Sequence, residues 1–398
     1  MEKLVQIFRA LLEPVNLKFK RYLWNEIDWS NRLIAITGAR GVGKTTLILQ
    51  YIKERFGENL DAVLYVSMDE LYFTKTSLTD FTLEFVKRNG KFLFLDEVHK
   101  YPDWSVEVKN IYDRHPGLSI VITGSSALNI FKGKADLSRR LILYKLNGLS
   151  FREFLELKYE LKFPVLTLDE LTKTTDKISQ SINSKIKPIG LFEEYIKSGY
   201  YPFFRESEKT YYRRIVQVVN QILENDLPAI ERIEYQSVQK LRTLLSVISE
   251  SVPFKPNILK LSKQIGIDRD TLLKYLFLLG RADLLLLLQS DTSGTSKLNK
   301  PEKIYLNNPN LMIALSDRTA NTGTIRETFF FNQLRVRHAI NYSSRGDFLI
   351  DNKMTFEVGG TNKNQKQIAG LEDAYIAADN IEFAHNNVIP VWLFGFLY

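Results

Sequence analysis

Short, continuously apolar runs recur along the first 150 residues of the chain and alternate with segments that have the apolar spacing of helices. The apolar runs lie at 33–37, 61–69, 91–96, 118–123 and 141–146, and the helical segments at 3–23, 45–56, 78–89 and 106–115. Runs without polar interruption are typical of strands buried on both faces of a parallel sheet. The alternation predicts the α/β fold class, with a parallel three-layer core and an N-terminal helix in residues 1–150.

The first apolar run leads into a glycine-rich loop, and the loop leads into a helical segment. Residues 38–45 fit the P-loop pattern of glycine, four residues, then Gly-Lys-Ser/Thr. Glycines allow backbone N–H groups to surround phosphate oxygens, and the following helix presents its N-terminus to them. We expect Lys44 to reach the β- and γ-phosphates, where it is also catalytic, and the Thr45 hydroxyl to bind Mg²⁺. The predicted ATP-binding residues of this loop are Gly38, Ala39, Arg40, Gly41, Val42, Gly43, Lys44, Thr45 and Thr46.

A second pattern pairs an apolar run with two carboxylates. Phe92–Leu95 is followed by Asp96 and Glu97, which is the Walker B arrangement. The end of such a strand lies at the edge of the sheet where the P-loop also emerges. We expect Asp96 to hold Mg²⁺ and Glu97 to polarise the attacking water as general base, with Asp69 as the next candidate base. An ordinary strand followed by an acidic turn is the alternative.

The run at 118–123 ends in small polar residues, and a basic pair precedes the fifth run. A polar side chain at the end of the strand beside Walker B would contact the γ-phosphate, and Thr123, Ser125 and Ser126 are candidates, with Ser125 placed in the nucleotide site. A Ser/Gly turn is the alternative. Arg139 and Arg140 are candidate catalytic residues, because one of them would act as an arginine finger on a neighbouring subunit's phosphate. A solvated basic pair explains them equally well.

From residue 151 the pattern becomes mainly helical. We expect a helical connector over 151–235, with an exposed polar insertion at 168–187. Three helical segments and two short strands over 236–306 predict a winged helix-turn-helix. Arg269 and Lys274 would then contact DNA, whereas the apolar third helix, with Asp268 at its N-cap, favours a structural or protein-contact module.

The last ninety residues predict a small α/β domain over 307–398, with a helix at 323–334 and strands at 346–350, 354–360 and 388–396. Glu327, Asp347 and Glu357 would converge on a metal in a two-metal nuclease. Such a strand usually carries a lysine two residues after its acid, and here that position is Gly359. Lys363 and Lys366 would substitute only if their loop folded back. We therefore interpret this domain as a nuclease-like fold without the chemistry.

The composition limits which binding partners and which cellular compartment we expect. The chain has 398 residues and no cysteine, which excludes disulfides and thiolate metal sites, and its four histidines lack metal-ligand spacing. Lysine and arginine exceed the acidic residues by 54 − 46 = +8. This net positive charge is compatible with a nucleic-acid partner, but the basic residues are dispersed along the chain. The N-terminus has no secretory apolar core, and no uncharged apolar run reaches the roughly 20 residues that span a bilayer. We expect a cytoplasmic protein without a membrane partner.

Four motifs together resemble the prokaryotic AAA-type P-loop ATPases that carry a C-terminal domain of unknown function. They are Gly38–Thr45, Phe92–Glu97, Thr123–Ser126 and the Leu-Ser-Phe-Arg-Glu-Phe run at 149–154. The segment Gly323…Glu327…Leu334 is similar to the entry helix of that C-terminal domain, which resembles the restriction-endonuclease-like fold. The resemblance implies binding of ATP with Mg²⁺ and its hydrolysis.

Two functions follow as hypotheses. In the first, the protein is an ATP-driven switch or remodeller that acts on a protein client. In the second, it binds or processes DNA through the winged helix and the ATPase is auxiliary. An arginine finger supplied by a neighbour would make the protein an oligomer.

Overall fold

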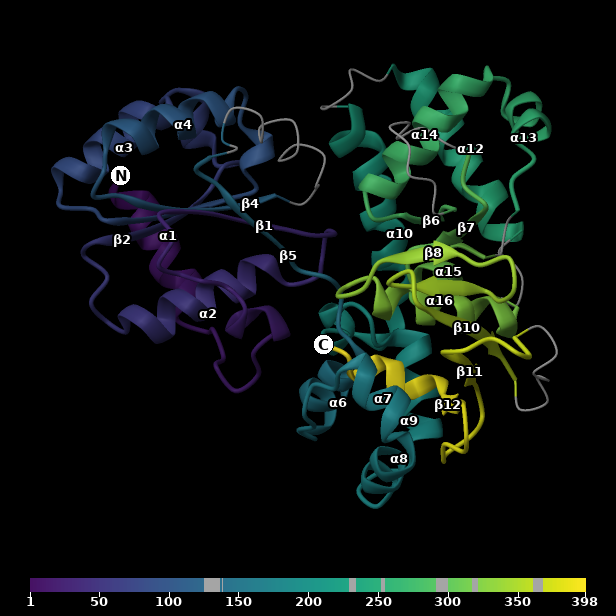
Figure 1. The fold of residues 1–398 in the computed structure, drawn as a ribbon. Helices are drawn as coiled ribbons and strands as arrows, with labels where there is room; N and C mark the ends of the chain where they lie inside the picture. The colour runs from purple at the N-terminus through teal and green to yellow at the C-terminus, as the bar shows by residue number, and fades with distance from the viewer. Residues whose placement is uncertain are drawn as a thin grey trace. The chain divides into compact units, whose positions relative to one another are not determined.

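The structure, a computed structural model, describes residues 1–124, 137, 139–228, 234–251, 255–290, 300–316, 321–360 and 368–398. These residues form two compact units, 1–147 and 148–398 (Figure 1). In the described part of the chain, no helix combines the length and the apolar character that crossing a membrane requires.

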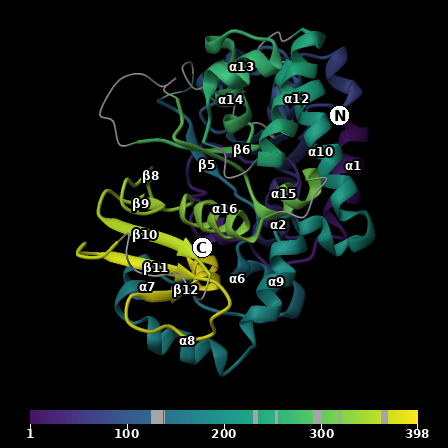
Figure 2. The same cartoon turned by 90° about the vertical axis from the view of Figure 1, so that its right-hand side faces the viewer.

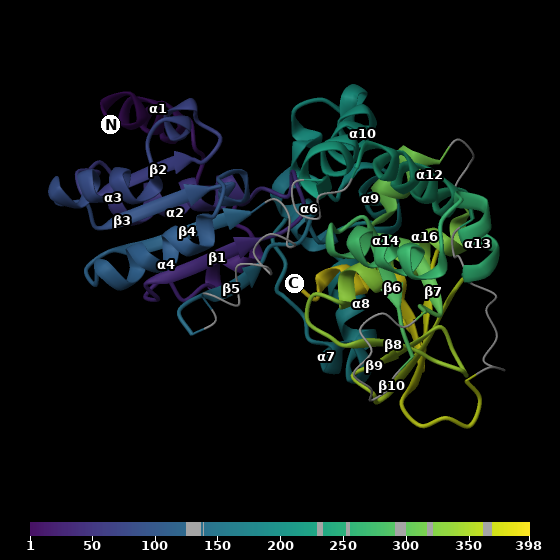
Figure 3. The same cartoon turned by 90° about the horizontal axis from the view of Figure 1, so that it is seen from above.

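A five-stranded, fully parallel sheet forms the centre of the first unit. Its strands are β1 (Leu33–Thr37), β2 (Val63–Ser67), β3 (Phe92–Asp96), β4 (Ser119–Gly124) and β5 (Ile142–Lys145). They lie in the order β2-β3-β4-β1-β5 (Figure 3), so β4 separates the strand before the P-loop from the strand that ends in Asp96. Every residue of β1 is buried, as expected for a strand covered on both faces.

Helices cover both faces of this sheet. They are α1 (Glu2–Leu12), α2 (Lys44–Phe56), α3 (Leu78–Lys87) and α4 (Trp104–Arg114), with 3-10 turns η1 (Tyr22–Asn25), η2 (Leu71–Thr74) and η3 (Val98–Lys100). α3 and α4 lie on one face and α1 and α2 on the other (Figure 1). Right-handed crossovers explain this, because the chain crosses the sheet in opposite directions after β1 and after β2. The α/β core with three layers is thus confirmed. The helix expected over 3–23 ends at Leu12, because Pro14 cannot continue it.

The second unit begins with helices and continues into a hairpin. Its elements are α6 (Phe151–Tyr159), α7 (Leu168–Lys173), α8 (Thr175–Asn183), α9 (Pro188–Ser198), α10 (Tyr211–Gln221), α12 (Tyr235–Ser251), α13 (Ile258–Ile265), α14 (Arg269–Arg281), β6 (Leu285–Leu288) and β7 (Lys303–Leu306), with short turns η4 (Pro202–Arg205), η5 (Glu208–Thr210) and η6 (Ile222–Asp226). The expected exposed insertion is instead α7 and α8, which bury Leu168, Leu171 and Ile182. Glu170, one of its polar residues, forms a capping box with Thr167, the residue just before the insertion. Asp268 caps α14 as expected.

A mixed five-stranded sheet completes the second unit (Figure 2). After α15 (Pro309–Leu315) and α16 (Thr322–Leu334) come β8 (Ile340–Tyr342), β9 (Phe348–Ile350), β10 (Met354–Gly359), β11 (Ala374–Ala378) and β12 (Val388–Pro390). They follow chain order across the sheet, antiparallel from β8 to β10 and parallel from β10 to β12, and α16 packs on β10. The strand expected over 388–396 ends at Pro390, and the chain continues as the 3-10 helix η8 (Val391–Phe396).

Candidate functional site

The P-loop turns tightly between β1 and α2. Gly38 has φ +153°, and a Cβ there would lie 2.1 Å from the carbonyl oxygen of Leu146, so only glycine fits. Gly43 has φ 97° and forms the N-cap of α2, which directs the first N–H groups of the helix into the loop. The Lys44 amine donates to the carbonyl oxygens of Gly38 and Ala39, both at 2.9 Å. The predicted phosphate-binding residues therefore share one compact turn at the carboxyl edge of the sheet.

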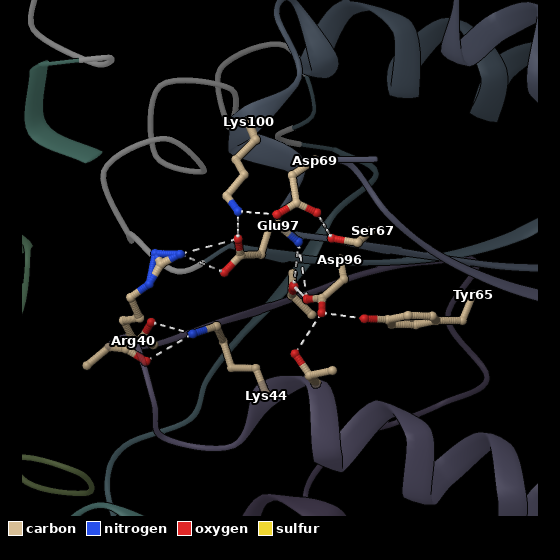
Figure 4. A network of polar contacts seen from close by, with 12 residues as sticks. Arg40, Lys44, Tyr65, Ser67, Asp69, Asp96, Glu97 and Lys100 are labelled. Atoms are coloured by element: carbon tan, nitrogen blue, oxygen red, sulfur yellow. Dashed lines mark hydrogen bonds and ion pairs between the residues drawn. The ribbon is translucent and has the colours of Figure 1, made fainter. Parts of the chain in front are cut away.

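Asp96 is the centre of a hydrogen-bond network (Figure 4). Its Oδ2 accepts from the hydroxyl groups of Thr45, at 2.6 Å, and Tyr65, at 2.7 Å. Its Oδ1 accepts from the Thr123 hydroxyl and from the backbone N–H of Glu97. Asp96 is only 4% exposed, so these four donors fix the orientation of its carboxylate. The structure thus brings together the two predicted Mg²⁺ ligands and one of the three candidate γ-phosphate contacts.

The residues present fit Mg²⁺ chemically. Mg²⁺ is a hard cation that takes oxygen ligands and keeps several waters, so one hydroxyl and one carboxylate beside the phosphates suffice. Thr45 and Asp96 are the residues that would hold it, and the ion would neutralise negative charge on the phosphates. The tight contact between the two means that the carboxylate also orients the Thr45 hydroxyl.

Tyr65 is a member of the site that sequence reasoning missed. It lies in β2, which pairs with β3, and the sequence around it is that of an ordinary buried strand. Burial, together with the charge of Asp96, raises the pKa of Tyr65, so its hydroxyl stays protonated and donates to Asp96. The one available signal was a tyrosine within an otherwise aliphatic run.

Glu97, the predicted general base, lies between two cations. Its backbone is left-handed, with φ 52°, which turns the side chain out of the strand direction. The Arg40 guanidinium lies 3.4 Å from its Oε1 and 3.5 Å from its Oε2, and the Lys100 amine contacts Oε2. Lys100 also pairs with Asp69, the second candidate base, which accepts a hydrogen bond from Ser67 as well.

Two further groups near Glu97 have shifted pKa values. Partial burial opposes the charge on Lys100, but hydrogen bonds to Asp69 and Glu97 outweigh it and raise the pKa of the amine. Burial, only partly offset by the charge of Glu97, lowers the pKa of His99 to about 4. At neutral pH the site therefore holds a charged lysine and a neutral histidine next to the predicted base.

The other predicted site residues lie elsewhere or outside the described residues. Arg140 pairs through two nitrogens with Asp113 of α4, at 2.8 and 3.0 Å, and Arg139 is exposed. An arginine finger acting in a second subunit stays a prediction. Ser125 and Ser126 lie outside the described residues.

The carboxylates of the second unit meet a lysine. The Lys303 amine, from β7, lies 3.2 Å from Oε2 of Glu327 and 3.0 Å from Oδ1 of Asp347. The Tyr305 hydroxyl also donates to Glu327, at 2.6 Å. Burial and the charge of Asp347 raise the pKa of Glu327, whereas Lys303 acts in the opposite direction. Within the described ranges, no three His, Cys, Asp or Glu side chains form a group that could hold a metal ion. Lys363 and Lys366 fall outside those ranges.

Comparison with known proteins identifies two matching segments. Residues 30–155 match a family model described as an AAA domain, and residues 189–322 match one described as a domain of unknown function. An uncharacterised protein of Methanocaldococcus jannaschii is 28% identical over 305 residues. The alignment covers 72% of this chain and 62% of that protein, so the chain spans less than two thirds of the relative's length.

Solved structures similar to the chain include a Walker-type ATPase of Pyrococcus abyssi, at 13% identity, 76% coverage of this chain, 99% of that one and a TM-score of 0.41. DnaA from Aquifex aeolicus, bound to AMPPCP, is 16% identical, with coverages of 68% and 85% and a TM-score of 0.25. C. elegans PCH-2 is 16% identical, with coverages of 43% and 47% and a TM-score of 0.24. The family match over residues 30–155, together with the P-loop and the contact between Thr45 and Asp96, supports an AAA-type P-loop ATPase domain in the first unit.

Proposed function

We propose that this chain binds ATP with Mg²⁺ and hydrolyses it, and that nucleotide turnover drives a conformational switch or the remodelling of a protein client. The observation that carries this proposal is the 2.6 Å hydrogen bond between Thr45 and Asp96. It joins the hydroxyl at the start of α2 to the carboxylate at the end of β3, although 51 residues separate them. A phosphate-bound Mg²⁺ requires these two oxygen donors at one point.

Each residue then has a distinct task. Lys44 and the N-terminus of α2 neutralise and orient the phosphates, while Thr45 and Asp96 hold the metal. Glu97 lies at the same edge of the sheet and would take the proton of the attacking water. Thr123 connects these parts, because its hydroxyl donates to Asp96 and accepts from the backbone N–H of Glu97.

Nucleotide binding is tested with a fluorescent ATP analogue. In Lys44→Ala, we expect affinity to fall by about tenfold or more, because a charge-assisted contact to the phosphates is lost. Lys53→Ala is the matched control, since Lys53 lies in the last turn of the same helix and bonds to the carbonyls of Glu13 and Val15. Equal affinities in the two folded variants would refute ATP binding through this loop.

Hydrolysis and switching are tested with Glu97→Gln. This variant should keep the nucleotide and lose turnover by roughly 10²–10⁴-fold, because an amide cannot accept the proton of the water. If turnover drives a switch, amide hydrogen exchange in residues 148–398 should differ between the ATP-bound variant and the ADP-bound protein. Full turnover in Glu97→Gln would assign the base elsewhere, and identical exchange in both states would refute the switch.

DNA binding is a second candidate, because exposed basic residues cluster around α13 and α14. They are Lys255, Lys260, Lys263, Arg269 and Lys274. Two features oppose sequence-specific contacts: Arg269 pairs with Asp270 at 3.2 Å, and the apolar residues of α14, such as Leu272 and Leu276, are buried. A nonspecific phosphate contact should weaken steeply as salt rises, which a fluorescence anisotropy titration with duplex DNA would show. Binding that is absent at low salt would exclude this function.

A further inference from the structure

The P-loop itself carries an arginine that contacts the predicted base. Arg40 lies between Gly38 and Gly41, and its guanidinium points from the loop to the carboxylate of Glu97 (Figure 4). The two side chains are 21% and 20% exposed, so water screens their charges only in part. Their distances of 3.4 and 3.5 Å are long for a charge-assisted pair, which is usually about 2.7–2.9 Å. The contact is therefore loose enough to be exchanged for a better anion.

Lys100, the other cation on Glu97, is held in place differently. Its amine also pairs with Asp69, so it keeps a carboxylate partner whatever happens to Arg40. Lys100 can therefore keep Glu97 oriented after the guanidinium has left. Of the two cations, Arg40 is the one built into the phosphate-binding loop.

Arg40 also belongs to the loop that is predicted to bind the terminal phosphate. Lys44, which should reach the β- and γ-phosphates, contacts the carbonyls of Gly38 and Ala39, the two residues before Arg40. The planar guanidinium binds a phosphate through two parallel N–H groups, which a single lysine amine cannot do. A terminal phosphate at this point would compete with Glu97 for the same donors.

We propose that Arg40 is a catalytic residue that exchanges its contact with Glu97 for the terminal phosphate of ATP and so releases the base. This inference rests on the proposed ATPase function and adds a way in which bound ATP would regulate the catalytic base. In the reaction, the water oxygen bonds to the γ-phosphorus as the bond to the β–γ bridging oxygen breaks. ADP leaves with that electron pair, and the proton of the water passes to Glu97. Because ADP lacks the terminal phosphate, Arg40 stays on Glu97 when ADP is bound.

The first experiment compares ATP and ADP affinities of the full chain. Arg40→Ala should weaken ATP binding by about tenfold or more and change ADP binding by less than about twofold, since only ATP carries the contacted phosphate. Its turnover should fall by roughly 10³-fold or more, as for other arginines that neutralise this transition state. Arg88→Ala is the matched control, because Arg88 is an exposed arginine that pairs with Glu84 on α3.

The second experiment tests the competition. Glu97→Gln removes the charge that holds Arg40, so it should tighten ATP binding severalfold in the wild-type background and not in Arg40→Ala. Equal effects of Glu97→Gln in both backgrounds would overturn the exchange. Wild-type discrimination between ATP and ADP in Arg40→Ala would overturn the phosphate contact while leaving ATP binding by the protein intact. Failure of the wild-type chain to bind ATP would instead refute the proposed function itself.

Discussion

Acidification should destabilise the first unit through His99, which lies beside the predicted base. Burial lowers its pKa from 6.5 to about 4, so the folded protein disfavours the charged ring. Between these two values the unfolded chain binds a proton that the folded chain does not. The free energy of unfolding therefore decreases as the pH falls through this window. The variant that removes the effect is His99→Gln, whose side chain does not titrate.

The size of the effect follows from the two pKa values. The gap between 6.5 and about 4 amounts to about 3 kcal/mol when fully expressed. Protonation is incomplete at intermediate pH, and linkage gives about 2 kcal/mol between roughly pH 7 and pH 5. The wild-type protein should lose this much free energy of unfolding relative to His99→Gln over that interval. Any constant cost of the substitution cancels in the comparison.

Amide hydrogen exchange of peptides from β3 measures this free energy locally. Wild type and His99→Gln are compared at each pH, which cancels the pH dependence of intrinsic exchange. The difference between wild type and His99→Asn should show the same pH step, even if the absolute stability of that variant differs. A wild-type-to-variant difference that stays constant between the two pH values would refute the assignment of a neutral, buried His99.

Three further predictions concern other contacts. Lys303→Met should lower the free energy of unfolding by about 3–5 kcal/mol in urea denaturation, because Glu327 and Asp347 lose their buried cation. This loss should be smaller in the Glu327→Gln background, and equal losses in the two backgrounds would contradict the pairing. Tyr65→Phe removes a donor to Asp96 and should raise the Mg²⁺ concentration needed for nucleotide binding severalfold; an unchanged Mg²⁺ titration would remove Tyr65 from the site. Plasmid, linear DNA and RNA incubated with Mg²⁺ or Mn²⁺ should stay intact; cleavage that disappears in Glu357→Ala would show that the second unit is a nuclease.

Features encoded in adjacent residues were predictable from the sequence. The P-loop, the five strands of the first sheet and the Asp268 cap each depend on local residue order, and the structure has all of them. The contact between Thr45 and Asp96 was also accessible, because parallel strands that end in functional residues bring them to one edge. Local patterns combined with one topological rule were sufficient for this part of the site.

Features that depend on tertiary contacts were not predictable in this way. Tyr65 reads as a core residue until β2 is placed beside β3, and Lys100 reads as a solvated lysine until it meets Asp69 and Glu97. Strand β8 has only three residues, and the Ala-Tyr-Ile-Ala-Ala run of β11 has no alternation of apolar and polar residues, so neither gives a clear strand pattern. The partners of these elements come from distant parts of the chain, and no single-sequence pattern identifies them.

The buried amine of Lys303 has a consequence for how this protein could have been assembled by recombination. The sequence pattern suggests a boundary near residue 306, between the hairpin and the last α/β elements. Lys303 lies before that boundary, and both of its carboxylate partners lie after it. A crossover at residue 306 with a relative lacking this lysine would leave two neighbouring carboxylates without their cation, which is costly in a buried setting. The hairpin and the sheet therefore have to be inherited together.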